Sequence, residues 1–219
     1  MKLELGLAVG FASGDEGLVA DVVIDPHARK VSHVVVQPRH HPSEARLVPM
    51  PNLVVEDAGD RLVCDTAFDA FPLVEMTRFV RMSEPIEMAD DWDVGIEHAM
   101  AYPYYAGDFN GVDWAMLRGG ADAQEIGVTF HRIPKGEVEI RRESEVLTSD
   151  GERVGTVDGF LLDDDHVTHV ILERGHWWGR HEIAIPVSGV ASVRNDAITL
   201  DLTADEVAAL PRPTKVVRP

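Results

Sequence analysis

The sequence predicts a mainly β protein that contains two copies of one small domain. Apolar, often β-branched runs recur between turn residues, as in Val19–Ile24 and Val31–Val36 on either side of Asp25-Pro26. Such runs are typical of strands. The segment Gly17–Asp25 is also similar to Gly155–Asp163, at an offset of 138 residues. Solenoid repeats have shorter periods, so this offset indicates a duplicated domain.

The first repeat, residues 1–72, reads as a series of short strands closed by a short helix. Leu53–Val55 and Arg61–Cys64 flank Asp57-Ala58-Gly59-Asp60, which is the pattern of a β-hairpin. Closely spaced short strands predict a small barrel or sandwich, not a parallel sheet with crossover helices. Thr66–Asp69, ahead of Pro72, predicts the short closing helix. The expected strands are Val19–Ile24, Val31–Val36, Ala45–Met50, Leu53–Val55 and Arg61–Cys64.

The second repeat, residues 137–211, follows the same order and leaves a tail at 212–219. Thr203 and Glu206 have the spacing of a capping box, and Pro211 ends the helix that they start. This helix is the counterpart of Thr66–Asp69 in the first repeat. The expected strands are Glu137–Ile140, Val154–Leu162, His166–Glu173, His181–Pro186, Val190–Val193 and Ala197–Leu200.

The connector, residues 73–136, matches neither repeat. It contains all three tyrosines of the chain, Tyr102, Tyr104 and Tyr105, and it is acidic. A flexible linker would be rich in Gly and Ser and poor in aromatic residues, so we expect this segment to be ordered. It begins with Val74–Met82, which predicts a short helix or strand.

The acidic composition argues against direct binding of nucleic acid or of an anionic membrane. The formal net charge is −18, from 38 acidic and 20 basic residues, and such a surface repels phosphate. No apolar run approaches the length of a membrane span, and the N-terminal residues lack a signal-peptide pattern. A single cysteine, Cys64, lies in an apolar stretch and reads as a small buried hydrophobic residue. We therefore expect a cytoplasmic protein.

The second repeat carries a resemblance to a known family. Val167–Leu172 is followed by Gly175-His176-Trp177-Trp178-Gly179, then by His181–Pro186 and by the apolar Val190. This succession resembles the PRC-barrel domain: a strand, a glycine-bracketed loop, and a strand that ends in an aliphatic residue and proline. The first repeat is similar through Val31–Val36 and Leu47–Pro49, but Gln37–Pro42 replaces the glycine-bracketed loop.

The resemblance implies two small PRC-like barrels, each with a short C-terminal helix, joined by the connector. PRC-barrel proteins include the cytoplasmic domain of the photosynthetic reaction-centre H subunit and the C-terminal domain of a 16S rRNA maturation factor. They also include stand-alone bacterial proteins of unknown role. This chain, with tandem copies around an acidic connector, resembles that group most. The family has no shared catalytic residues and mostly binds other macromolecules, so the resemblance implies no enzyme and no cofactor.

Residues that could carry chemistry have simpler interpretations as structural elements. Neither His-x-His nor Cys-x-x-Cys spacing occurs, so we expect no metal site. His33 and His169 hold equivalent positions in strands, which favours a role in the fold over catalysis. Asp163–Asp165 lacks the ligand pattern of a calcium loop and reads as a turn. No nucleophile, phosphate loop or metalloprotease motif is present.

The function predicted from the sequence is a non-enzymatic protein-interaction or scaffold module, with an unidentified protein partner or a second copy of the chain. Exposed aromatic side chains beside arginine are typical of binding hot spots. The alternatives are a ribosome- or RNA-processing-associated factor that acts through a protein contact, and a sensor of a small ligand or ion. The expected partner-binding residues are Trp177, Trp178, Arg180, Tyr102, Tyr104 and Tyr105.

Overall fold

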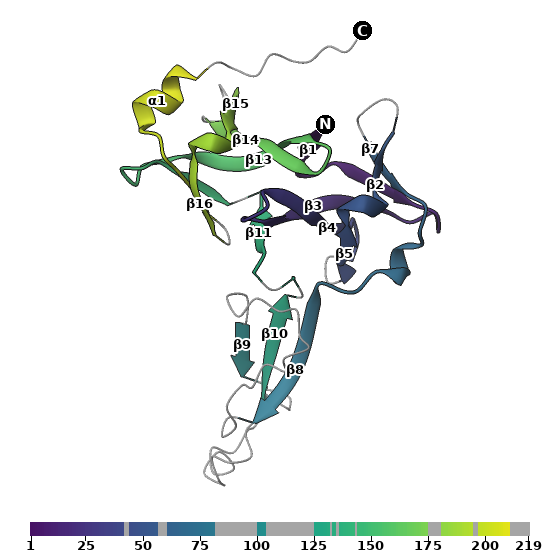
Figure 1. Cartoon of the computed structure of the whole chain (residues 1–219). Coiled ribbons are helices and arrows are strands. Elements are labelled where there is room, and N and C mark those ends of the chain that lie inside the picture. The colour runs from purple at the N-terminus through teal and green to yellow at the C-terminus, as the bar shows by residue number, and fades with distance from the viewer. Residues whose placement is uncertain are drawn as a thin grey trace, which may run out of the picture.

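The computed structural model describes residues 1–41, 44–56, 61–81, 100–103, 125–131, 133–134, 136–142, 144–174, 181–194 and 197–210. The protein is mainly β, and the described residues contain one α-helix, which is short (Figure 1). None of the described helices is long and apolar enough to cross a membrane.

Among the described residues, the first half contains seven strands and two 3-10 helices, and the second half follows the same order with the α-helix α1 in place of the last 3-10 helix. The first half comprises β1 (Lys2–Glu4), β2 (Ala8–Phe11), β3 (Glu16–Asp25), β4 (Lys30–Pro38), β5 (Arg46–Pro49), η2 (Met50–Asn52), β6 (Val54–Val55), β7 (Arg61–Cys64) and η3 (Phe68–Ala70). The second comprises β11 (Val138–Arg141), β12 (Glu145–Leu147), β13 (Arg153–Asp163), β14 (His166–Arg174), β15 (His181–Pro186), η7 (Val187–Gly189), β16 (Val190–Arg194), β17 (Ala197–Leu200) and α1 (Ala204–Ala209).

Strand pairing follows the same order in the two halves. β2 pairs antiparallel with β3 and parallel with β7, and β12 pairs antiparallel with β13 and parallel with β17. The antiparallel series β3–β4–β5 corresponds to β13–β14–β15, and β6–β7 corresponds to β16–β17. All these strands belong to one sheet of fourteen strands, whose path runs from β16 to β6 and does not close.

The first strand of each half pairs with the other half. β1 lies antiparallel to β13, with Leu3 opposite Phe160, and β11 lies antiparallel to β3, with Ile140 opposite Val22. Figure 1 shows β1 beside β13 and β11 beside β3. The exchange joins the two halves through main-chain hydrogen bonds.

A second reciprocal contact links the turns that follow β3 and β13. The amide of Val31 donates to the carbonyl of Asp165, and the amide of Val167 donates to the carbonyl of Arg29, each at 2.9 Å. Lys30 also forms an ion pair with Asp165 at 3.2 Å. Like the pairing of β1 and β11, these two hydrogen bonds are reciprocal, because each half supplies one amide donor and one carbonyl acceptor at equivalent positions.

One hydrophobic core spans both halves. Leu3 and Phe160 belong to the same buried cluster as Val22 and Ile140, and all four are fully buried. Because exchanged strands bring core residues with them, neither half encloses its own core alone. Burial of large apolar side chains is the main source of folding free energy.

The connector forms a separate three-stranded sheet, with β10 (Glu125–His131) between β8 (Glu75–Arg81) and β9 (Met100–Pro103). Figure 1 shows this sheet, here called the arm, projecting away from the fourteen-stranded sheet. Val74, just before β8, and Ile133, just after β10, are buried in a second cluster. That cluster lies on the face of β3, β4 and β5 formed by Val23, Val35 and Leu47. The base of the arm is thus fixed to the first half.

Most predicted elements are confirmed, with shifts of up to three residues at their ends. Val74–Met82, predicted as helix or strand, is the strand β8. Thr203 and Glu206 form the predicted capping box at the start of α1, and the counterpart in the first half is the 3-10 helix η3. The sequence analysis missed β1, β2 and β12, which are three or four residues long.

Candidate functional site

The arm is the candidate functional site that follows from the predicted tyrosine stretch. Tyr102 lies on β9, where its backbone is opposite Gly127 of the central strand β10. β9 is at one edge of the three-stranded sheet and β8 is at the other. Tyr104, Tyr105, Trp177, Trp178 and Arg180 lie outside the described residues, so their prediction stands untested.

The base of the arm is held by main-chain contacts as well as by apolar packing. The amide of Val74 donates to the carbonyl of Ala45 at 2.9 Å, and the amide of Leu47 donates to the carbonyl of Pro72 at 3.0 Å. These bonds attach the segment before β8 to β5. An element that is anchored at its base and projects beyond the core can contact another molecule without disturbing the fold.

His33 and His169 occupy matching positions in the two halves. His33 Nδ1 lies 2.9 Å from the hydroxyl of Ser32, and His169 Nδ1 lies 3.2 Å from the hydroxyl of Thr168. Each hydroxyl also lies near a carbonyl of the facing strand: the Ser32 oxygen is 3.4 Å from the carbonyl of Val23, and the Thr168 hydroxyl donates to the carbonyl of Leu161 at 3.0 Å. Repetition of this arrangement at equivalent positions of the two halves fits a structural role.

Glu137 adds a contact at His33 that has no counterpart at His169 among the described residues. The hydroxyl of Ser32 donates to its carboxylate, which lies 4.0 Å from His33 Nδ1. Glu137 lies between the arm and β11, so this contact helps to fasten the end of the connector to β4.

The Asp163–Asp165 segment forms the turn that the sequence predicts. Asp163 ends β13, His166 starts β14, and Asp164 between them has a φ of 51°. Lys30 lowers the pKa of Asp165 through its side-chain hydrogen bond. Within the described ranges, no group of three His, Cys, Asp or Glu side chains could hold a metal ion. Cys64 is buried in the core, as predicted.

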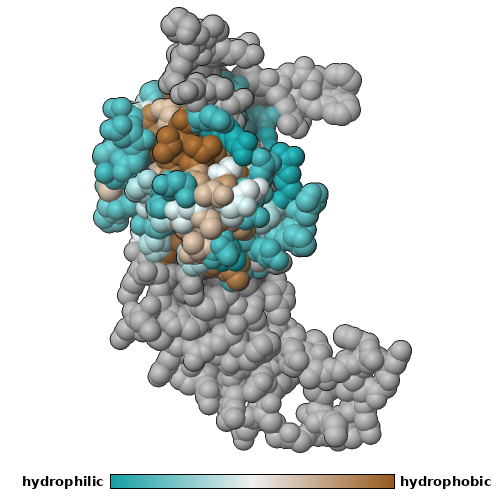
Figure 2. Space-filling view, turned by 90° about the vertical axis from the view of Figure 1, so that its right-hand side faces the viewer, coloured by the Kyte–Doolittle hydropathy of each residue, from teal (hydrophilic) through white to brown (hydrophobic). Residues whose placement is uncertain are grey.

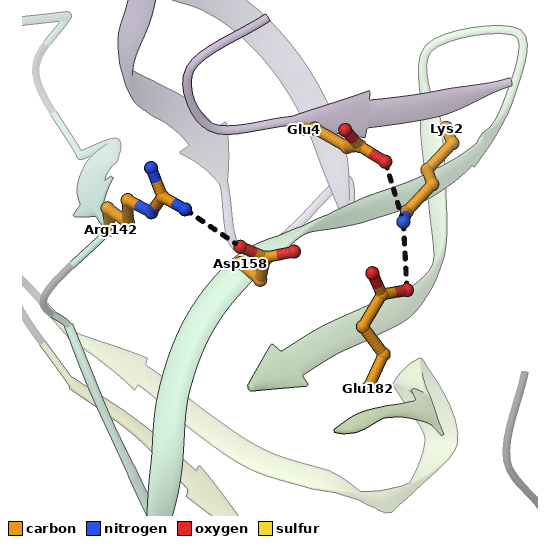
Figure 3. Close-up of polar contacts among 5 residues, drawn as sticks. All are labelled: Lys2, Glu4, Arg142, Asp158 and Glu182. Atoms are coloured by element: carbon orange, nitrogen blue, oxygen red, sulfur yellow. Dashed lines mark hydrogen bonds and ion pairs between the residues drawn. The ribbon is translucent and has the colours of Figure 1, made fainter. Parts of the chain in front are cut away.

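The sequence analysis missed an ionic cluster where β1 crosses β13. Lys2 Nζ lies 2.6 Å from Glu4 and 2.8 Å from Glu182 on β15, and Arg142 lies 3.7 Å from Asp158 on β13. Figure 3 shows these side chains gathered around the crossing. The cluster joins residues of β1 to residues of the second half, so it reinforces the strand exchange. A lone carboxylate in the apolar run Val154–Leu162 was the available sequence signal.

The cluster changes the pKa of two of its members. Burial raises the pKa of Asp158, Arg142 opposes that change, and Glu182 adds to it. Burial alone would lower the pKa of Lys2, but its hydrogen bonds to Glu182 and Glu4 outweigh burial and raise it. The arrangement pairs each cation with a carboxylate, which is the pattern of a structural ion network.

The second half is similar to a known family. Residues 140–208 match the family DUF2171, described as an uncharacterized protein conserved in bacteria. The match starts on β11 and ends on α1, so it covers the second half and not the arm. No curated protein sequence matches the chain.

Proposed function

We propose that the chain is a non-enzymatic protein-interaction module made of two PRC-like halves, with the arm as its principal binding element. Each half is proposed to be a curled, barrel-like unit derived from one duplicated domain. The shared pairing order supports this, as does the inclusion of Val9, Val48 and Leu62, from β2, β5 and β7, in a single buried cluster.

The observation that carries the proposal is the position of Tyr102. Tyr102 lies on an edge strand of a sheet that projects from the body and whose base is anchored in the second apolar cluster (Figure 1). Edge strands offer backbone groups to another chain, and tyrosine is enriched in binding hot spots. The arm therefore combines an anchored base with an edge strand that carries a tyrosine.

Affinity capture from the native host after gentle crosslinking tests this proposal. The wild-type chain is expected to retain a stoichiometric protein partner, and the triple variant Tyr102→Ser, Tyr104→Ser, Tyr105→Ser is expected to lose it. The thermal midpoint of the variant should equal that of the wild type, because the arm lies outside the shared core. Recovery of the chain alone would contradict the proposal.

The same experiment separates the alternatives. Ribosomal proteins among the captured partners, released by the tyrosine variant, would favour the ribosome-associated factor. A chain recovered without partners, whose thermal midpoint rises with a metal ion or metabolite, would favour the sensor of a small ligand.

A further inference from the structure

The outer surface of the sheet at its β6 end carries apolar side chains that are not packed in the hydrophobic core. Val54 on β6 is opposite Val63 on β7, while the next pair, Val55 and Leu62, turns toward the core. Val54 is 64% exposed and Leu62 is fully buried. Because side chains alternate along a strand, Val54 and Val63 share the outer face.

The apolar surface continues across the next two strands. Gly10 of β2 is level with Val63, and Ala8 of β2 is opposite Leu18 of β3, so Ala8 and Leu18 also face outward. Both are only partly buried, and neither belongs to the two buried clusters. We call Ala8, Leu18, Val54 and Val63 the edge surface. Figure 2 views the molecule from the side of β2 and β7 and shows apolar residues bordered by hydrophilic ones.

The side chain of Arg61 lies across the edge surface, over Gly10. The guanidinium of Arg61 crosses Gly10 to reach the carboxylate of Glu16 at 2.8 Å. A β-carbon at position 10 would lie 2.1 Å from the Arg61 guanidinium, so the glycine makes this path possible. The ion pair neutralises the arginine and leaves its aliphatic stem to extend the apolar area.

The second half shows that the fold does not require apolar residues at these positions. The pairing register makes Ser192 and Thr199 the counterparts of Val54 and Val63. By the same register, Glu145 and Thr156 are the counterparts of Ala8 and Leu18. Four apolar side chains in one half thus correspond to four polar ones in the other, on strands with the same pairing.

The charges at the rim specify what could cover the edge surface. Glu16 has a side chain that is 62% exposed, and Asp15, Glu56 and Asp65 are exposed around β6 and β7. The net charge of the chain is −18. A second copy would bring the same charge to this acidic rim, whereas a cationic segment would be attracted to it. β6 is also the last strand of the described sheet order, so an extended segment can be added beside it.

We propose that the edge surface binds an extended segment of a partner protein in which apolar residues alternate with Lys or Arg, laid along β6. The apolar side chains of the segment would continue the row formed by Val54 and Val63, and its cations would face the acidic rim. This inference rests on the proposed function, because it assigns a second contact surface to the same interaction module.

A short synthetic peptide that alternates Lys and Val, with blocked ends, is the probe. Its binding to the full chain is followed by amide chemical shifts at about 0.15 M salt, where long-range attraction is largely screened. Shifts are expected at Val54, Val55 and the neighbouring residues of β7. The double variant Val54→Ser, Val63→Thr copies the second half and leaves the net charge unchanged. It is expected to weaken binding about tenfold or more, which corresponds to ~1.4 kcal/mol or more.

Matched controls separate the surface from general charge attraction. Ser192→Ala with Thr199→Ser changes the equivalent positions of the second half and should leave peptide binding unchanged. A Glu–Val peptide should fail to bind. If Val54→Ser with Val63→Thr lowers the thermal midpoint, the single variant Leu18→Thr supplies the same test on another strand and should also weaken binding.

Three outcomes would overturn the proposal: equal binding by the double variant and the wild type, equal binding of the Glu–Val peptide, or a dimer of the chain that Val54→Ser with Val63→Thr dissociates. The last outcome would make a second copy the occupant. If the tyrosine variant loses the captured partner while the Val54/Val63 variant keeps it, the proposed function stands and only this surface is rejected.

Discussion

The backbone of Leu3 passes directly over Gly159. A β-carbon at position 159 would lie 2.4 Å from the carbonyl oxygen of Leu3 and 3.0 Å from the Cα of Glu4. Real atoms do not approach so closely, and the obstacle is main chain, which cannot rotate away. β1 can therefore pack against β13 only because residue 159 is a glycine and has no side chain.

Gly159→Ala is expected to destabilise the protein by about 1–3 kcal/mol, because β1 must shift to make room. Chemical denaturation measures the loss, and hydrogen exchange should show that Leu3 and Leu5 lose protection first. Gly189→Ala is the control, since its nearest neighbour is the flexible end of Leu202 at 3.2 Å. Equal stability of Gly159→Ala and wild type would contradict the close packing of β1 on β13.

Leu3→Ala tests the contribution of the exchanged strand to the core. Leu3 is fully buried although it is the third residue of the chain, so the truncation is expected to cost about 2–5 kcal/mol. Leu73→Ala is the control, because Leu73 is 40% exposed and should cost much less. A change at Leu3 no larger than that at Leu73 would mean that β1 is dispensable.

Asp158→Asn is expected to raise the stability at neutral pH. The pKa of Asp158 is higher in the folded chain than its ordinary value of 3.8, chiefly because of burial. Protonation of Asp158 therefore stabilises the folded chain fully at pH values below that ordinary value. This stabilisation is lost as the pH rises through the pKa of Asp158 in the folded chain. Asparagine cannot ionise, so the gain in thermal midpoint should be present at neutral pH and disappear below the ordinary pKa.

The attraction between Arg142 and the Asp158 carboxylate opposes the cost of burying that carboxylate. The variant Arg142→Gln measures this attraction. This variant is expected to be less stable than the wild type at neutral pH, because the half-buried carboxylate loses its ion-pair partner. A loss of stability in Asp158→Asn at neutral pH would show that the ion pair outweighs the cost of burial.

Thr203→Ala is expected to cost about 1 kcal/mol by removing the cap of α1. The side chain of Thr203 accepts from the amide of Glu206, and its amide and hydroxyl donate to the carboxylate of Glu206, which lowers the pKa of that carboxyl. A lowered pKa contributes stability above the ordinary value of 4.5, and this is lost as the pH falls through the folded pKa. The cost should shrink in acid, and Thr203→Ser should restore most of the stability. A pH-independent cost would contradict the role of the carboxylate.

Local sequence was sufficient for the strands that carry long apolar runs. Val31–Val36 lies within β4, and His181–Pro186 matches β15 residue for residue. β1 was missed because it is only three residues long, so the alternation of Leu3 and Leu5 with Lys2 and Glu4 is too short to stand out. β2 was missed because Gly10 interrupts it, and that glycine is explained only by Arg61, which lies on another strand.

The strand exchange and the ionic cluster could not be predicted in this way. Both depend on which half pairs with which, and an apolar strand carries the same pattern whichever partner it meets. The correspondence of His33 with His169 was visible in the sequence, and the matching hydrogen bonds follow from it. The partner-binding residues other than Tyr102 lie outside the described residues, so the prediction for them stays open.

The exchange of first strands also sets the order in which the chain can fold as it is synthesised. β1 is synthesised long before its partner strand β13, and the amine of Met1 donates to the carbonyl of Leu162, 161 positions away. The first half cannot complete its sheet before β11 has been made, and β1 must wait for β13. Pairing over such sequence distances slows folding because a long loop must close before the contact forms. A nascent chain that stops within the arm therefore has an unfinished first half and an unpaired β1.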